Sequence, residues 1–222
     1  MIGREIRESV FRDTKNHYVT FPVGLVARPL VRFVQKHAGN SIVDLGCATG
    51  NYCLHLASLG YSVRGADINP EYIRIACERG VDAHRIEDRI PFEDASCDSV
   101  ILFEVLEHVA APGPLLSEAR RIARKNVLIT TPNSDNTVLL QQQGVLYEHF
   151  GDLDHKNFFT EESLGHLLRE SFPRVQVWKG DGLNPLGLFP GAAVRLAGKA
   201  LLRAHIIPPA FHFRLYAVAD VR

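Results

Sequence analysis

The chain of 222 residues lacks several features that would assign it to a special class of protein. No apolar run reaches the roughly 20 residues that a helix needs to cross a bilayer. Internal repeats and low-complexity tracts are absent, and the four cysteines have no C-x-x-C spacing of the kind that binds metal. Residues 1–12 are charged throughout, so we expect no signal peptide there. This pattern favours one α/β domain with additional segments.

Net charge is also absent, because 25 basic and 25 acidic side chains cancel. Residues 41–185 carry 13 Lys or Arg and 21 Asp or Glu, whereas both flanking regions are basic. Nucleic-acid affinity comes largely from clustered Lys and Arg. The acidic central region therefore argues against nucleic acid as a partner.

All four cysteines fall in or beside predicted core elements. Buried free thiols are typical of proteins in a reducing cytoplasm. We therefore expect a cytoplasmic protein in which Cys47, Cys53, Cys77 and Cys97 are unpaired and buried.

Strand and helix patterns alternate along the chain, which predicts a parallel sheet with crossover helices. The first predicted helix covers 21–37, where Pro29 is expected to cause a bend. Strands are predicted at about 41–45, 61–66, 81–85, 98–103, 126–130, 174–179 and 212–219, and further helices at about 51–59, 70–79, 113–123, 160–171 and 192–204.

The most informative run, SIVDLGCATGNY at 41–52, places an acid and two glycines between a strand and a helix. A second acid, Asp67, ends the next strand. Glycines let the backbone approach a nucleoside, and an acid at that position can accept both ribose hydroxyls. The spacing D-x-G-C-x-x-G lacks the third small residue of a dinucleotide site. It favours a ligand without a pyrophosphate.

Four ordered segments carry a resemblance to class I S-adenosylmethionine-dependent methyltransferases: VDLGCATGNY, GADINPEYI, IPFEDASCDSVILFEVLEHV and VLITTPN. The resemblance covers about 42–172 and implies a Rossmann-like, seven-stranded, mostly parallel sheet with helices on both faces and an antiparallel last strand. It also implies S-adenosylmethionine as cofactor. The residues that it assigns to cofactor binding are Asp44, Gly46, Cys47, Gly50, Asp67, Ile68, Phe103 and Glu104.

The adenine contact departs from the family pattern. Members often have an acid five positions before the Pro of the L-P-F segment, and Ile86 occupies that position here. Glu87 is then the candidate for the adenine edge, with a backbone N–H as the alternative.

The sequence E-x-x-E-H contains Glu104, Glu107 and His108. In a first helical turn these side chains would share one face and could hold Mg²⁺, Mn²⁺, Fe²⁺ or Zn²⁺, with His155 as a fourth ligand. The region resembles quinone-biosynthesis O-methyltransferases and small-RNA 3′-terminal 2′-O-methyltransferases. In metal-free relatives the acid and His contact the cofactor or cap the helix, and His155 is alternatively a structural lid residue. His149 is a weaker candidate.

The resemblance implies methyl transfer to a hydroxyl oxygen of a small molecule, lipid or glycan. His108 or His155 would act as the base, and Glu107 would orient it. The alternatives are methylation of an RNA terminal 2′-hydroxyl and a non-catalytic module that binds S-adenosylmethionine.

Three regions are expected: a lead-in with a helix at 1–40, the cofactor-binding region at 41–179, and an insertion with the final strand of the same domain at 180–222. The helix within the insertion spaces Arg195, Lys199 and Arg203 at four residues, so they share one face. Either this helix packs on the sheet as a lid or flank, or 190–205 contacts an anionic membrane surface or a lipid-like substrate.

Overall fold

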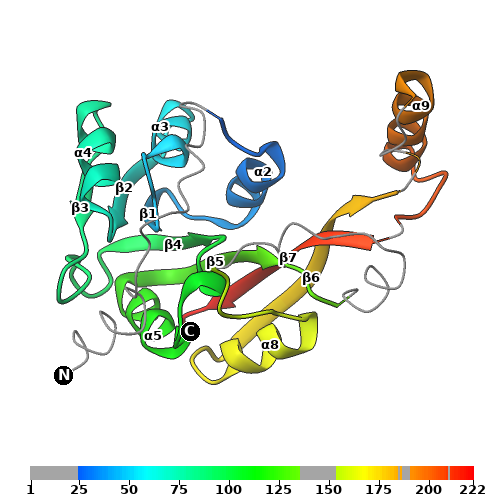
Figure 1. The fold of residues 1–222 in the computed structure, drawn as a ribbon. Helices are drawn as coiled ribbons and strands as arrows, with labels where there is room; N and C mark the ends of the chain where they lie inside the picture. Colours follow the sequence, from blue (N-terminus) through cyan, green and yellow to red (C-terminus); the bar gives the residue numbers. More distant parts are fainter. Residues whose placement is uncertain (1–24, 136–153, 185, 187–190, 210) are drawn as a thin grey trace.

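A single seven-stranded sheet forms the centre of the computed structural model, which describes residues 25–135, 154–184, 186, 191–209 and 211–222 (Figure 1). The strand order is β3-β2-β1-β4-β5-β7-β6. The strands are β1 (Ser41–Leu45), β2 (Ser62–Asp67), β3 (Ala83–Arg85), β4 (Cys97–Phe103), β5 (Ala123–Pro132), β6 (Arg174–Leu183) and β7 (Phe211–Asp220).

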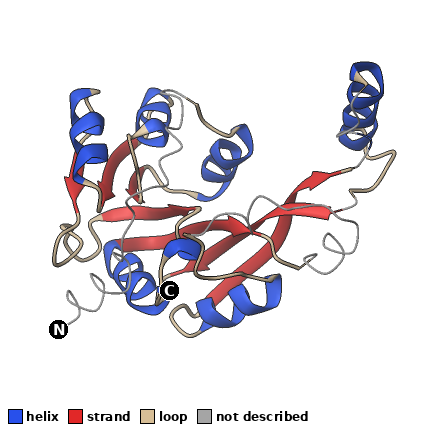
Figure 2. Ribbon diagram, in the orientation of Figure 1, coloured by secondary structure: helices blue, strands red, loops and turns tan. Residues whose placement is uncertain are grey.

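Helices cover both faces of this sheet (Figure 2). Apolar side chains of α2 and α3 pack on one face, and those of α5 and α8 pack on the other. The helices are α2 (Arg28–His37), α3 (Asn51–Ser58), α4 (Pro70–Glu78), α5 (Pro112–Ile122), α8 (Glu161–Arg169) and α9 (Ala192–Arg203), with a 3₁₀ helix, η1 (Leu106–His108).

Strand direction confirms the predicted fold class. β1 runs parallel to β2 and β4, and β4 runs parallel to β5. The last strand, β7, is antiparallel to both β5 and β6. Parallel strands end at one edge of the sheet, and ligands bind outside that carboxyl edge in open α/β sheets.

Alternating apolar residues give the sheet its two buried faces. Ile42 and Ile101 belong to the cluster beneath α2, whereas Val43 and Val100 belong to the cluster beneath α5 and α8. All four are at most 1% exposed. Successive side chains of a strand point to opposite faces, so continuous apolar runs become a core on each side.

Two local predictions were wrong. Helix α2 begins at Arg28, so Pro29 lies in its first turn, where the missing N–H costs nothing, and does not bend it; residues 21–24 lie outside the described residues. Cys77 is exposed on α4, whereas Cys47, Cys53 and Cys97 are buried free thiols as predicted. Within the described ranges, every helix is too short or too polar to cross a bilayer.

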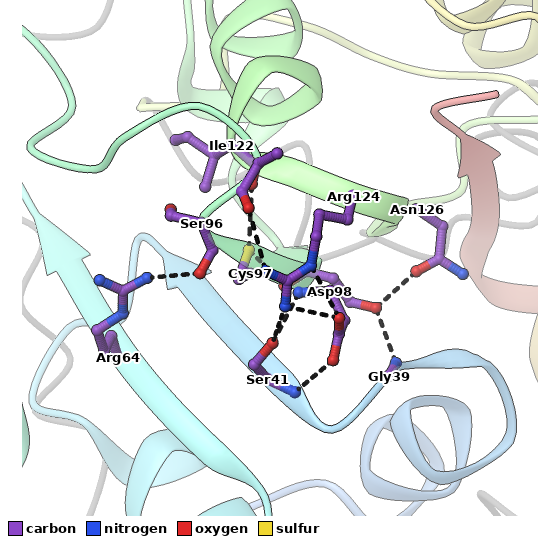
Figure 3. A network of polar contacts seen from close by, with 11 residues as sticks. Gly39, Ser41, Arg64, Ser96, Cys97, Asp98, Ile122, Arg124 and Asn126 are labelled. Atoms are coloured by element: carbon purple, nitrogen blue, oxygen red, sulfur yellow. Dashed lines mark hydrogen bonds and ion pairs between the residues drawn. The ribbon is translucent and has the colours of Figure 1, made fainter.

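At the opposite edge of the sheet, a polar network centred on Asp98 joins the first residues of three strands (Figure 3). The Asp98 carboxylate accepts the backbone N–H of Ser41 at 3.0 Å and the Arg124 guanidinium at 2.8 Å. Beside it, Ser99 Oγ donates to Asn126 Oδ1 at 2.7 Å. The hydrogen bond from Ser41, followed by that from Arg124, lowers the pKa of Asp98 to about 2.

This shift predicts a pH-dependent contribution of Asp98 to stability. The folded-state pKa lies below the unfolded value of 3.8, so the contribution is present above about pH 4 and is lost as pH falls towards 2. We expect Asp98→Asn to lower the free energy of unfolding by about 1–2 kcal/mol at pH 7, because water screens this partly exposed pair. The difference from wild type should shrink towards pH 3 in urea titrations.

Asp94→Asn is the matched control, since Asp94 also pairs with an arginine but its side chain is 81% exposed. It should change stability by less than about 0.5 kcal/mol at either pH. A pH-independent loss in Asp98→Asn would contradict the assignment.

Candidate active site

The loop after β1 requires glycine at two positions. Gly46 and Gly50 have φ of +85° and +79°, a region that favours glycine. A Cβ at Gly46 would lie 2.6 Å from a Val105 methyl, and one at Gly50 would lie 2.6 Å from a Val81 methyl. The N–H groups of Gly46 and Cys47 both donate to the carbonyl of Ala66, which ties the loop to β2.

Asp67 ends β2 beneath the same loop and is buried. Its Oδ2 accepts the N–H of Ala48, and its Oδ1 accepts the N–H of Asn69, both at 2.9 Å. Each oxygen retains a further lone pair, as a ribose acid requires. Asn69, and not Asp67, caps helix α4, because its side chain accepts the N–H groups of Glu71 and Tyr72. The binding of ribose hydroxyls by Asp67 stays a prediction.

Asp44 lies near the end of β1 and is also buried. The Cys53 thiol lies 3.6 Å from its Oδ2 and donates to it. Burial is the main cause that raises the pKa of Asp44 to about 7; the Cys53 hydrogen bond opposes the rise, and the nearby Asp67 carboxylate adds to it. Such a carboxyl group gains from a cationic ligand, which is the role that the family resemblance assigns to it.

The residues predicted for the adenine side lie in two environments. Ile68 is partly buried against the core, and the N–H of Ile86 donates to the Asp67 carbonyl at 2.8 Å. Glu87 is exposed and pairs with Arg85 at 3.4 Å. Its contact with adenine stays a prediction.

The E-x-x-E-H sequence does not form one helical turn, so its predicted common face is wrong. Glu104 follows β4 with φ of +54°, and η1 begins only at Leu106. The side chain of Glu104 reaches β7, where its Oε1 accepts Arg214 Nε at 2.9 Å. Phe103, the last residue of β4, is buried with its ring 5.5 Å from that of Tyr52.

The sequence interpretation missed Arg214. This residue lies on β7, and its side chain is only 13% exposed. Besides Glu104 it pairs with Asp181 of β6, which also accepts the Tyr216 hydroxyl at 3.0 Å. The antiparallel register places Arg214 opposite Pro132, the last residue of β5, and so brings a basic side chain to the carboxyl edge.

Glu107 is buried beside this pair, with an exposed fraction of 1%. Its Oε2 accepts the Thr131 hydroxyl at 3.2 Å, and its Oε1 has no hydrogen-bond partner among the described residues. Burial raises the pKa of Glu107 well above the usual range, and the charge of Glu104 adds to this. The Glu107 carbonyl accepts the N–H groups of Lys156 and Asn157, which fastens the later segment to η1.

That attachment brings His155 to His108, with ring centroids 4.7 Å apart. One ligand atom each from Glu107, His108 and His155 lies within 4.8 Å of the others. The structure thus brings together three of the four predicted metal ligands. Glu104 is paired with Arg214 instead, and His149 lies outside the described residues.

The surroundings of Arg214 predict a large effect of its removal on stability. Arg214→Met keeps the apolar stem but leaves Glu104 and Asp181 without their cation, which should cost about 3–5 kcal/mol of unfolding free energy. The control is Arg174→Met, because Arg174 pairs with Asp220 at the surface with its side chain 72% exposed, and it should cost less than about 1 kcal/mol. Equal losses in urea titrations would show that burial of the Arg214 pair is irrelevant.

The raised pKa of Asp44 predicts a change of stability with pH that is opposite in direction to that predicted for Asp98. A folded-state pKa of about 7 against 3.8 unfolded means that wild type loses stability as pH rises between these values. Asp44→Asn cannot lose a proton there, so its unfolding free energy should vary less, by on the order of 3 kcal/mol across the window. Thermal unfolding of both proteins from pH 4 to pH 8 measures the difference, and parallel curves would refute it.

Comparison with known proteins agrees with this geometry. The sequence profile of the methyltransferase domain family matches residues 17–171. Two curated relatives are ubiquinone biosynthesis O-methyltransferases. The protein of Cupriavidus pinatubonensis is 27% identical over 67% of this chain and 66% of its own length, and that of Burkholderia thailandensis is 28% identical over 70% and 75%.

Solved structures share the fold. A SAM-dependent methyltransferase from Archaeoglobus fulgidus aligns with a TM-score of 0.63 and 18% identity, over 86% of this chain and 91% of that one. A possible histamine N-methyltransferase from Thermotoga maritima aligns with a TM-score of 0.57 and 19% identity, over 83% of each chain. With a family match that spans most of its length, this chain belongs to the methyltransferase domain family and is an S-adenosylmethionine-dependent methyltransferase.

Proposed function

We propose that this enzyme methylates a hydroxyl oxygen of a small molecule or lipid. The observation that carries the proposal is the group formed by Glu107, His108 and His155 at the end of β4. A hydroxyl acceptor must lose its proton during methyl transfer, and an imidazole beside a buried carboxylate suits that task. The names of the two relatives support oxygen as the acceptor atom. This chain spans about two thirds of the length of one relative and three quarters of the other.

The residues present fit S-adenosylmethionine as methyl donor. Gly46 and Gly50 allow close backbone approach, Asp67 offers both oxygens to ribose hydroxyls, and Asp44 offers a carboxyl group to the cationic amino group. The donor supplies a methyl group already activated by its sulfonium. The protein must therefore align the acceptor oxygen with the S–CH₃ bond at about 3–3.5 Å.

In the proposed reaction the acceptor oxygen forms a bond to the methyl carbon while the carbon–sulfur bond breaks. The hydroxyl proton passes to an imidazole nitrogen of His108 or His155, and then to solvent. The buried Glu107 Oε1, which has no hydrogen-bond partner among the described residues, is available to orient the imidazole as it takes up this proton. A positioned base of this kind contributes about 10²–10⁴-fold to the rate.

The same three side chains also fit a divalent cation. One carboxylate oxygen and two imidazoles suit Mn²⁺, Fe²⁺ or Zn²⁺ better than Mg²⁺, which prefers oxygen ligands throughout. Such an ion, when bound, lowers the pKa of a coordinated hydroxyl. Glu107, His108 and His155 would be its ligands, while Glu104 stays with Arg214.

Single substitutions at the two histidines test the proposal. His108→Ala or His155→Ala should lower kcat for an alkyl-substituted catechol by about 10²–10⁴-fold, because the proton then lacks its acceptor. Binding of S-adenosylhomocysteine, measured by calorimetry, should change by less than about threefold, since neither residue belongs to the glycine loop. Asp67→Ala should lose that binding, and His166→Ala, on the exposed face of α8, should behave as wild type. Full turnover in the double His variant would refute the proposal.

Calorimetry with Mn²⁺ alone separates the base from the metal. Saturable binding that is lost in Glu107→Gln and in His155→Ala indicates a metal centre. Absence of binding, with the kcat loss retained, indicates a metal-free base.

A further inference from the structure

The β6–β7 hairpin extends beyond the rest of the sheet. β5 ends at Pro132, opposite Arg214. β6 and β7 continue to pair beyond this point, where Gly182 lies opposite His212 and Leu183 lies opposite Phe211. Helix α9 follows this extension and stands away from the other helices (Figure 1). It therefore lies beyond the carboxyl edge, the same edge that carries the active site.

Helix α9 is almost entirely exposed. Gly198 is its one buried residue. Leu196 is 71% exposed and Val194 is 41% exposed, and Ile206 just after the helix is 68% exposed. The prediction that this helix packs on the sheet is therefore wrong, and Val194 and Leu196 face solvent, while Leu201 and Leu202 are half-buried.

The exposed face combines these apolar side chains with positive charge. Leu196, Lys199, Ala200 and Arg203 follow the spacing i, i+3, i+4 and i+7, so they share one face of the helix. Residues 191–209 contain three Lys or Arg and no Asp or Glu. Long basic side chains beside a leucine can reach anionic headgroups while the leucine enters the acyl region.

This surface suits a bilayer better than a protein. A stable protein interface buries about 800 Å² on each partner, and this face of a 12-residue helix, with one large apolar side chain in Leu196, offers little area for that. Two copies of the helix would also bring like charges together. An anionic bilayer complements the charge and offers apolar volume to Leu196 and Ile206.

We propose that α9 and the adjoining residues 205–207 form a docking surface for an anionic phospholipid bilayer. Docking there turns the carboxyl edge of the sheet towards the membrane. His108 and His155 then face the phase in which an apolar acceptor dissolves. The docking itself does not depend on the acceptor, so the two proposals are tested separately.

Co-sedimentation with phosphatidylcholine vesicles that contain about one third phosphatidylglycerol tests the charge contribution. Lys199→Glu with Arg203→Glu should weaken vesicle binding by about tenfold or more, and added salt should weaken binding of wild type. The matched control is Arg32→Glu with Lys36→Glu, an exposed basic pair at the same spacing on α2. This control should bind as wild type.

The apolar contribution is tested by Leu196→Gln, with Leu59→Gln as its control, because Leu59 is also exposed but lies beside α3. Only the first substitution should weaken vesicle binding. S-adenosylhomocysteine binding and methylation of a water-soluble catechol should be unchanged in every α9 variant, which separates a docking defect from a catalytic one.

Three results would overturn the proposal. One is failure of wild type to bind anionic vesicles. Another is equal loss of binding in the α2 control pair. The third is concentration-dependent self-association in ultracentrifugation that Leu196→Gln abolishes, because α9 would then be an interface between two copies of this chain.

Discussion

The guanidinium of Arg214 is the contact on which the acidic edge of the sheet depends. It lies between Glu104, which follows β4, and Asp181, which is on β6. Both acids have positive φ, +54° and +52°, a conformation that costs free energy for residues other than glycine. Ion pairs to one shared partner support both of these backbone conformations. A side chain of β7 therefore fixes the ends of two other strands.

The charge of the ligand gives this edge a second role. Asp44, Asp67 and Glu107 are buried, and burial raises the pKa of each. S-adenosylmethionine is a sulfonium cation, whereas the sulfur of its demethylated product is neutral. A site lined by buried acids therefore binds the cationic donor more favourably than the product. This difference in binding free energy favours replacement of the product by a new donor after each turnover.

The sequence predicted those parts of the molecule that depend on local pattern. Apolar runs followed by turn residues located the strands. The glycine loop could be placed because a steric requirement fixes Gly46 and Gly50, and Asp67 because it ends a strand. The E-x-x-E-H sequence misled, because its spacing is helical but the positive φ of Glu104 breaks the turn. Arg214 was missed because its contact with Glu104 spans 110 residues and depends on the register of an antiparallel strand. The sequence left open whether α9 packs on the sheet or lies exposed, because an amphipathic helix has the same pattern in both cases.

The position of β7 between β5 and β6 constrains the order in which the chain can assemble. During synthesis β6 leaves the ribosome before β7, and it has no neighbour in the sheet until β7 arrives. Pairing of β7 with β5 and β6 joins segments that are far apart in the sequence. Such pairing is slow because the chain between the strands must close into a loop first. The nascent protein can thus form its glycine loop and the parallel half of its sheet while still lacking Arg214. The carboxyl edge of the sheet is therefore complete only after the final strand has inserted.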